Sequence, residues 1–281
     1  MLDIRLIASD IDGTLLPRGG AISERTRRAV QGCRERGIPF IISSGRWIGA
    51  LEGVARQAGV VQQAGTEGMP MIIANGAAVV GPDSETLQEW LMDDVDVRRA
   101  YEIMRGFGLQ VNGYVRDALY CVNTRALVRQ STMIREYLGT GHARLVVDDE
   151  AAFEAEALHR AYKLEGLIED PERIGAAREA LRETGLVVTY SSPRNVEVMA
   201  AGVGKGVALR WLAGELGVPL ADCMAFGDND NDLDMLTAVG WPVVVSNGTD
   251  EAKAAARLIA PADAEDGVAR IILEQVLGVG A

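Results

Sequence analysis

Cysteine and histidine are scarce in this chain. Its three cysteines, Cys33, Cys121 and Cys223, lie far apart. An odd number of cysteines without a CxxC pair excludes the disulfide framework of a small secreted protein and a cysteine-based zinc site. The chain also lacks a G-x-S-x-G elbow and a Cys/His pair, so the sequence does not indicate a serine or cysteine nucleophile.

Long hydrophobic runs and an excess of positive charge are absent as well. No run of 18 or more uncharged apolar residues occurs, so we expect no transmembrane helix. Asp3 and Arg5 interrupt the N-terminal region, so we expect no signal peptide. The net charge of −12 argues against general binding to nucleic acid or to an anionic membrane. These absences predict a cytoplasmic protein, and they leave the oligomeric state open.

The chain has the composition of a folded protein and is long enough for two domains. It has 281 residues, of which 48% are hydrophobic and 24% charged. In residues 1–81, short apolar strands alternate with helices, and the strands end in polar residues and glycine. This pattern predicts a parallel sheet with right-handed crossovers, an α/β fold. The pattern resumes over residues 193–281, beginning with a strand near 196–199.

Residues 82–192 follow a different pattern, which predicts a smaller α+β domain inserted into the first. Helices are expected over 94–106, 124–137 and 171–184. Strands are expected over 109–114, 118–122, 143–147, 159–168 and 187–191.

Two acids end the first apolar run of the chain. Asp10 and Asp12 stand one residue apart, and residues i and i+2 of an extended chain point to the same side. Gly13 lets the chain turn away, and Thr14 adds a hydroxyl. Two carboxylates this close repel each other unless a cation or a shared proton neutralises them. The alternative interpretation is an ordinary acidic turn at the end of a strand.

Further polar residues follow two later predicted strands and begin one later predicted helix. Ser44 and the group Asp228, Asn231 and Asp232 follow the strands, and Lys205 begins the helix. Because ligands of open parallel sheets bind at the carboxyl ends of the strands, we expect these groups to gather near Asp10 and Asp12. Carboxylates, a backbone carbonyl and water form an all-oxygen site that suits Mg²⁺. Acids, a hard cation and a lysine around one cavity are the groups that phosphoryl transfer needs.

Simpler interpretations remain for several of these residues. Lys205 could be a solvated lysine at a helix start, and Ser44 could cap the helix that follows it. Asp230 and Asp234 are interpreted as first-turn acids that favour the helix dipole. The run that begins at Asp228 is not an EF-hand, because its sixth and twelfth positions are Leu233 and Val239.

Taken together, these residues resemble the haloacid dehalogenase superfamily. More narrowly, they resemble its Cof-type branch, subfamily IIB, which is sugar-phosphatase-like and has a C2-type cap. The motifs that carry the resemblance are Asp10-x-Asp12-Gly13-Thr14, Ser44-Gly45-Arg46, Lys205-Gly206 and Gly227-Asp228-x-x-Asn231-Asp232. Serine stands at position 44, where threonine is commoner. The matching motifs lie at both ends of the chain, whereas residues 82–192 match in position and size without a specific motif.

The resemblance implies a fold and a set of roles. The fold is a Rossmann-like parallel-sheet core, residues 1–81 and 193–281, with an α+β cap over residues 82–192 that selects the substrate. Asp10 would be the nucleophile that forms an aspartyl-phosphate, and Asp12 the general acid and base. Mg²⁺ would be held by Asp10, Asp228 and the backbone carbonyl of Asp12. The phosphoryl group would be bound by Ser44, Lys205, Asn231 and the amide near Gly13, with support from Asp232, Thr14, Arg46 and Asn75.

The resemblance implies a phosphatase that acts on a small phosphorylated metabolite, and the sequence leaves the substrate open. A sugar phosphate, phosphoglycolate and a phosphoglycerate-linked sugar all fit. A phosphomutase of the same superfamily is an alternative, because only the fate of the aspartyl-phosphate differs. A phosphoacceptor switch domain is a second alternative, although a small receiver has no place for the inserted domain.

Overall fold

The structure is a computed structural model that describes residues 1–17, 20–60, 68–116, 118–122 and 144–280. The chain forms two compact units. The first unit comprises Met1–Arg46, Leu51–Gln88 and Gly204–Ala281, and the second comprises Trp47–Ala50 and Glu89–Val203. Among the described residues, no helix combines the length and the apolar character needed to span a membrane.

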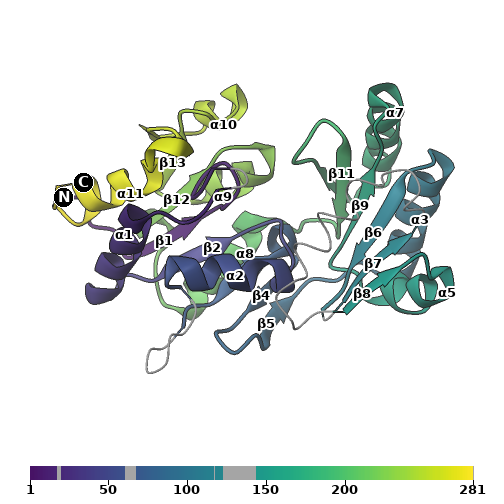
Figure 1. Ribbon diagram of the computed structural model, residues 1–281, viewed down its shortest axis with the longest axis horizontal. Helices are drawn as coiled ribbons and strands as arrows, with labels where there is room; N and C mark the ends of the chain where they lie inside the picture. The colour runs from purple at the N-terminus through teal and green to yellow at the C-terminus, as the bar shows by residue number, and fades with distance from the viewer. Residues whose placement is uncertain (18–19, 61–67, 117, 123–143, 281) are drawn as a thin grey trace. The chain divides into compact units, whose positions relative to one another are not determined.

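The first unit is built on an eight-stranded sheet (Figure 1). Its strands, in spatial order, are β14 (Leu258–Ala260), β13 (Trp241–Val245), β12 (Cys223–Gly227), β1 (Leu6–Ser9), β2 (Phe40–Ser43), β3 (Met71–Ile73), β4 (Ala78–Val80) and β5 (Thr86–Glu89). Neighbouring strands from β14 to β3 run parallel, and β4 runs antiparallel to β3. The predicted α/β fold with a parallel sheet is confirmed.

The central strands are buried because their sequences are apolar without alternation. Every residue of β1, β2 and β12 is buried, as expected for a parallel sheet covered on both faces. In register, Ala8 on β1 lies between Ala225 on β12 and Ile41 on β2. The residues that follow these three strands therefore emerge side by side at one edge of the sheet.

Helices connect the strands of the first unit. They are α1 (Glu24–Glu35), α2 (Ile48–Ala58), α8 (Lys205–Glu215), α9 (Leu233–Ala238), α10 (Asp250–Ala254) and α11 (Gly267–Ile271), with short 3₁₀ turns η1 (Ala74–Gly76), η4 (Leu220–Asp222), η5 (Asp230–Asp232) and η6 (Asp263–Glu265), and a π turn η7 (Ile272–Val276). Helix α1 begins where Ser23 accepts a hydrogen bond from the backbone N–H of Thr26, a typical N-cap. It packs against α11, and α8 packs against α9.

The second unit is built on a six-stranded sheet. In spatial order its strands are β10 (Val187–Thr189), β11 (Asn195–Met199), β9 (Lys163–Leu167), β6 (Gln110–Tyr114), β7 (Ala118–Val122) and β8 (Arg144–Val147). The neighbours are antiparallel except for β7 and β8, which are parallel. The helices are α3 (Asp94–Gly106), α5 (Glu150–Ala152), α6 (Leu158–Arg160) and α7 (Pro171–Arg182), with a π turn η3 (Phe153–Ala157). Their apolar side chains form one core with one face of this sheet.

The structure differs from the prediction at both junctions between the units. The strand predicted near 196–199 does not resume the parallel sheet, because β11 pairs antiparallel with β9 and β10. Its alternating sequence, Asn-Val-Glu-Val-Met, is typical of an antiparallel strand with two different faces. Beyond Gly81, β5 still belongs to the sheet of the first unit. The helix predicted over 124–137 lies outside the described residues.

Candidate active site

The predicted site residues lie in the first unit, at the carboxyl edge of its parallel strands. Asp10 follows β1, Ser44 follows β2 and Asp228 follows β12. Since β1 lies between β12 and β2, the fold itself places these three residues next to one another. Lys205 is the first residue of helix α8.

Lys205 joins two acids of the site. Its side chain is fully buried, and Nζ donates hydrogen bonds to Oδ1 of Asp10 and Oδ1 of Asp232, both at 2.6 Å. Burial alone would lower the pKa of the Lys205 ammonium, but the two carboxylates outweigh burial and hold the pKa above its usual range. The alternative of a solvated helix-start lysine is therefore wrong.

Asp10, Asp228 and Asp232 form an acidic cluster. One carboxylate oxygen of each lies within 4.8 Å of the others, and all three residues are buried. Burial raises the pKa of Asp10 well above its usual range, and the charges of Asp232 and Asp228 raise it further, whereas Lys205 opposes them. Three carboxylates share one ammonium, so the cluster has a deficit of positive charge. A divalent cation would correct that deficit.

The donor atoms of this cluster fit a hard cation. Both carboxylate oxygens of Asp232 already accept hydrogen bonds. Oδ1 accepts from Lys205, and Oδ2 accepts from the backbone N–H groups of Asp228 and Asn229 at 2.9 and 3.2 Å. Asp10 and Asp228 are the better ligands for this reason. Oδ1 of Asp228 accepts a hydrogen bond from the hydroxyl of Thr14 at 2.9 Å, which fixes the orientation of the carboxylate. An all-oxygen set of this kind suits Mg²⁺.

Asp12 lies apart from the acidic cluster and is held by Arg46. The guanidinium of Arg46 donates from Nε to Oδ2 of Asp12 at 2.6 Å and from Nη2 to Oδ1 at 2.5 Å. The Asp12 side chain is 36% exposed, in contrast with the buried Asp10. An Arg–carboxylate fork fixes both position and plane of the acid. The Asp12 side chain is therefore both fixed in orientation and more exposed than that of Asp10, which is 8% exposed.

Three further predicted residues surround the site. The backbone carbonyl of Ser44 accepts the N–H of Asn75 at 3.0 Å, and the amide of Asn231 donates to Oδ1 of Asn75 at 3.1 Å. Asn75 has a left-handed backbone with φ of 57°. The Ser44 hydroxyl accepts the N–H of Arg46 at 3.1 Å, which shapes the turn before α2.

Gly13 is required by close packing. Its φ is +91°, and a Cβ there would lie 2.7 Å from Oδ2 of Asp228. Its carbonyl accepts a hydrogen bond from the side chain of Asn247 at 2.8 Å. Asn247 was not among the predicted site residues, although an Asn-Gly pair close after an apolar strand is a signal that could have identified it.

Asp234 also has a role that its sequence context did not predict. Oδ2 of Asp234 accepts the backbone N–H of Gly206 at 2.7 Å, so this acid caps the helix that carries Lys205. Burial raises the pKa of Asp234. A Cβ at Gly206 would lie 2.3 Å from the carbonyl oxygen of Asp234, so glycine is needed for this contact.

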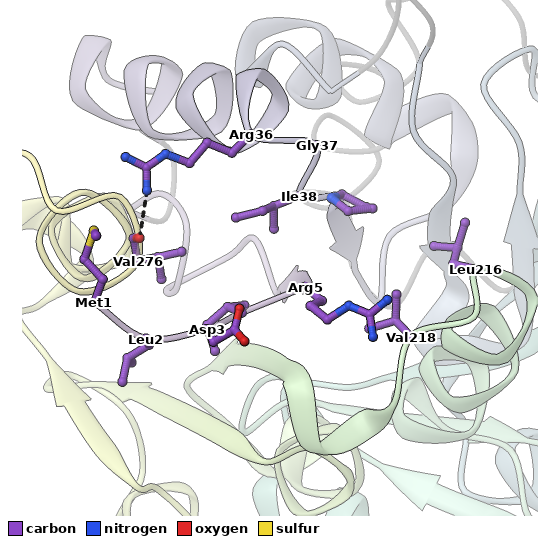
Figure 2. A pocket seen from close by; sticks show the side chains of 12 residues that line it. Met1, Leu2, Asp3, Arg5, Arg36, Gly37, Ile38, Leu216, Val218 and Val276 are labelled. Carbon is purple, nitrogen blue, oxygen red and sulfur yellow. Dashed lines mark hydrogen bonds between the residues drawn. The ribbon is translucent and has the colours of Figure 1, made fainter.

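A cavity of about 710 Å³ lies elsewhere in the first unit, beside the segments that precede β1 and β2 (Figure 2). Arg36 lines this cavity, and its guanidinium donates a hydrogen bond to the backbone carbonyl of Val276, the last residue of η7, at 3.1 Å. Its described lining contains none of the predicted site residues. The cavity therefore lies at the opposite end of the strands from Asp10.

Comparison with known proteins agrees with these observations. The sequence profile of the haloacid dehalogenase-like hydrolases matches residues 7–272. The chain is 27% identical to the 5-amino-6-(5-phospho-D-ribitylamino)uracil phosphatase YcsE of Bacillus subtilis, over 98% of this chain and 97% of that protein. It is 26% identical to the pyridoxal phosphate phosphatase YbhA of Escherichia coli, over 97% of this chain and 99% of that protein.

Solved structures share the fold. The HAD subclass IIB sugar phosphatase BT4131 superposes with a TM-score of 0.79 and 19% identity, covering 98% of this chain and 99% of that one.

Proposed function

The chain belongs to the haloacid dehalogenase-like hydrolases and is a hydrolase of phosphoric monoesters, and we propose that it is a Mg²⁺-dependent phosphatase of a small metabolite. The phosphoryl group would pass through an aspartyl-phosphate on Asp10. Relatives named for a phosphorylated ribityl compound and for pyridoxal phosphate support a small substrate.

The observation that carries the proposal is the buried bridge of Lys205 between Asp10 and Asp232. Its ammonium opposes the effect of burial on Asp10 and favours the ionised carboxylate, which is the nucleophilic form. The bridge also fixes the direction of the carboxylate at the end of β1. Positioning and neutralisation of charge supply most of the catalysis in phosphoryl transfer.

In the first half of the reaction, a carboxylate oxygen of Asp10 forms a bond to phosphorus while the bond from phosphorus to the substrate oxygen breaks. The leaving alkoxide needs a proton, and Asp12 in its protonated form would give it. Lys205, Ser44 and Asn231 would hold the phosphoryl oxygens. The backbone amide of Gly13 would help them.

In the second half, Asp12 as a carboxylate would take a proton from water. The water oxygen then attacks phosphorus, the bond to Asp10 breaks, and phosphate leaves. Arg46 would hold the Asp12 carboxylate in place for this step. Asp10 and Asp228, with the backbone carbonyl of Asp12, would hold Mg²⁺, which neutralises charge on the phosphoryl oxygens when bound. We also propose that the second unit acts as the cap that selects the leaving group.

Phosphate release from a panel of small phosphorylated metabolites, with Mg²⁺ and with EDTA, tests the proposal. We expect metal-dependent release, and Asp10→Asn should reduce kcat at least about 1,000-fold because the amide is no nucleophile. Asp230→Asn is the matched control, since Asp230 takes no part in the acidic cluster. Circular dichroism should show that both variants are folded.

Two results would contradict the proposal. Unchanged activity of Asp10→Asn would remove Asp10 from the mechanism. Transfer of phosphate between two positions of a sugar, without release, would instead identify a phosphomutase.

A further inference from the structure

The loop that follows strand β13 has no part in the proposed mechanism, although it leaves the sheet beside the site. We call residues 246–249 the β13 loop, since they come directly after Val245, the last residue of that strand. Strand β13 is the neighbour of β12, which is the neighbour of β1. Because these three strands run parallel, the β13 loop lies at the same edge of the sheet as Asp10 and Asp228.

The side chain of Asn247 connects two other turns at this edge. Nδ2 donates a hydrogen bond to the carbonyl oxygen of Gly13 at 2.8 Å, and Oδ1 accepts one from the backbone N–H of Asp263 at 2.9 Å. One partner is a carbonyl and the other an N–H, so only this orientation of the carboxamide satisfies both. Asn247 therefore ties the turn after β1 to the turn after β14 in a fixed geometry.

The position of the Gly13 carbonyl has a consequence for the Asp228 carboxylate. The hydroxyl of Thr14 donates to Oδ1 of Asp228 at 2.9 Å. The backbone of Gly13 borders the other oxygen, since a Cβ there would lie 2.7 Å from Oδ2. The peptide bond that joins Gly13 to Thr14 is planar, so a hydrogen bond to its oxygen holds the whole unit. Rotation of this peptide would move the Thr14 hydroxyl away from Asp228.

The β13 loop also holds the main chain of Asp228. The N–H of Thr249 donates to the carbonyl oxygen of Asp228 at 2.8 Å. Gly248 allows this close approach, because a Cβ there would lie 2.9 Å from the same oxygen. The loop thus acts on Asp228 twice, on its main chain directly and on its carboxylate through the side chain of Asn247.

Asn247 is exposed, whereas the groups that it holds are buried. Substitutions of exposed side chains usually have little effect on the free energy of unfolding. Removal of a group that orients a metal ligand has a larger effect, because it lowers metal affinity or activity by about 10–100-fold. The two kinds of role can therefore be separated by experiment at this position.

We propose that Asn247 is a positioning residue that sets the affinity of the site for Mg²⁺. It holds the carbonyl of Gly13, and through Thr14 it keeps the Asp228 carboxylate in the orientation that binds the cation. Without the Asn247 carboxamide this peptide is free to rotate, and binding of the cation has to order it. The inference rests on the proposed Mg²⁺-dependent function and adds to it a residue outside the four motifs.

The first test measures Mg²⁺ binding without substrate, from the dependence of Tm on the Mg²⁺ concentration. In Asn247→Ala we expect the Kd for Mg²⁺ to rise about tenfold, while Tm in EDTA changes by less than about 2 °C. A merely structural role would instead lower Tm in EDTA and leave the Kd unchanged. Ser246→Ala is the matched control, because Ser246 is also exposed and its described hydrogen bond runs from its backbone N–H to Ala260.

The second test asks whether Asn247 acts through Thr14. Thr14→Val removes the hydroxyl that orients Asp228, so it should also weaken Mg²⁺ binding about tenfold. In the Thr14→Val background, Asn247→Ala should then weaken binding by less than about threefold, because residues that act on one group are not additive. A further tenfold loss in that background would show an independent effect and overturn the proposed route.

Phosphate release from 4-nitrophenyl phosphate links binding to turnover. The rate of Asn247→Ala should be reduced at low Mg²⁺ and approach that of the wild type at saturating Mg²⁺, because the defect lies in metal binding. A reduction that persists at saturating Mg²⁺, with an unchanged Kd, would overturn the inference while the phosphatase function stands. If the wild-type protein neither binds Mg²⁺ nor releases phosphate, the proposed function fails and the inference fails with it.

Discussion

Lys205 is fully buried and has a carboxylate oxygen of Asp10 and one of Asp232 at 2.6 Å. Its charge compensates acids that burial would otherwise protonate, because burial raises the pKa of Asp10 well above its usual range. The same contact keeps Asp232 in place to accept the backbone of Asp228. A single side chain therefore connects the residue that follows β1 with the turn that follows β12.

Replacement of this lysine should affect both activity and stability. Lys205→Met retains much of the volume but leaves two buried carboxylates without a cation. We expect a loss of stability of about 3–5 kcal/mol, as for other buried ion pairs that lose one partner, and loss of measurable turnover. Calorimetry and phosphate release measure the two effects. A variant with wild-type Tm in the absence of Mg²⁺ would contradict the role assigned to Lys205.

A substitution of Arg46 tests whether this residue positions Asp12, the proposed general acid and base. In Arg46→Gln the fork onto Asp12 is lost, and Asp12 becomes free to move. We expect kcat to fall about 100-fold with a smaller change in KM, because small displacements of a catalytic group have effects of that size. Arg25→Gln is the matched control, since Arg25 forms a comparable pair with Asp266 at 2.9 Å. Equal kcat values for the two variants would show that Arg46 does not position Asp12.

The sequence predicted these residues to different degrees. Asp10, Lys205 and Asp228 could be identified because short motifs at the ends of strands carry chemistry. The role of Asp234 could not, since its partner is a backbone N–H that only the folded chain brings near. Hydrogen bonds to backbone groups leave no pattern of side-chain types in the sequence.

At the scale of elements, helix α8 depends on contacts at its first turn. Asp234 accepts the N–H of Gly206, and the turn at Asn75 and Gly76 packs closely against the start of α8. A Cβ at Gly76 would lie 2.1 Å from the carbonyl oxygen of Gly204. These contacts determine where Lys205 enters the site.

Loss of the cap should weaken this helix start. Asp234→Ala removes the acceptor for Gly206, so we expect a loss of about 1–2 kcal/mol of stability and a lower kcat as Lys205 shifts. Asp234→Asn keeps an acceptor oxygen and removes a charge that burial disfavours, so its Tm should be at least that of the wild type. Thermal unfolding and phosphate release compare the two variants. Equal losses in both would indicate that the charge of Asp234, and not its hydrogen bond, is required.

Strand placement shows where sequence patterns were sufficient. Continuous apolar runs identified β1, β2 and β3 as members of a parallel sheet, because such strands are covered on both faces. Asn195–Met199 alternates instead, and this alternation was a readable signal for the other sheet. Strands β4 and β5 were not predicted, since pairing at the edge of a sheet depends on a neighbour that is itself known only after folding.

At the scale of the whole molecule, the fold joins residues that are distant in sequence. Lys205 and Asp10 are separated by 195 positions. Periodicity predicts each strand and helix but does not specify this distance in space. The topology of the parallel sheet does, because it places β1 between β2 and β12, and helix α8 with Lys205 precedes β12 along the chain.

The three cysteines report on the integrity of both units. Cys33 and Cys223 are buried in the first unit, and Cys121 is buried in the second. Burial raises the pKa of Cys33 and Cys121 to about 12 and that of Cys223 to about 11. At pH 8 we therefore expect no rapid reaction of the native protein with 5,5′-dithiobis(2-nitrobenzoate), and three equivalents after unfolding in guanidinium. A rapidly reacting thiol in the native state would show that one of these sites is open.

These thiols should also make stability depend on alkaline pH. In the unfolded chain they lose protons near pH 8.5, whereas in the folded chain they remain protonated up to their raised pKa values. The unfolded state therefore binds fewer protons above about pH 8.5, and the free energy of unfolding should fall as pH rises from there. Thermal unfolding between pH 8 and 10 measures this slope, and a variant with all three cysteines replaced by alanine should show a shallower one at a lower overall Tm. Equal slopes would mean that the thiols ionise equally readily in both states, contrary to their burial.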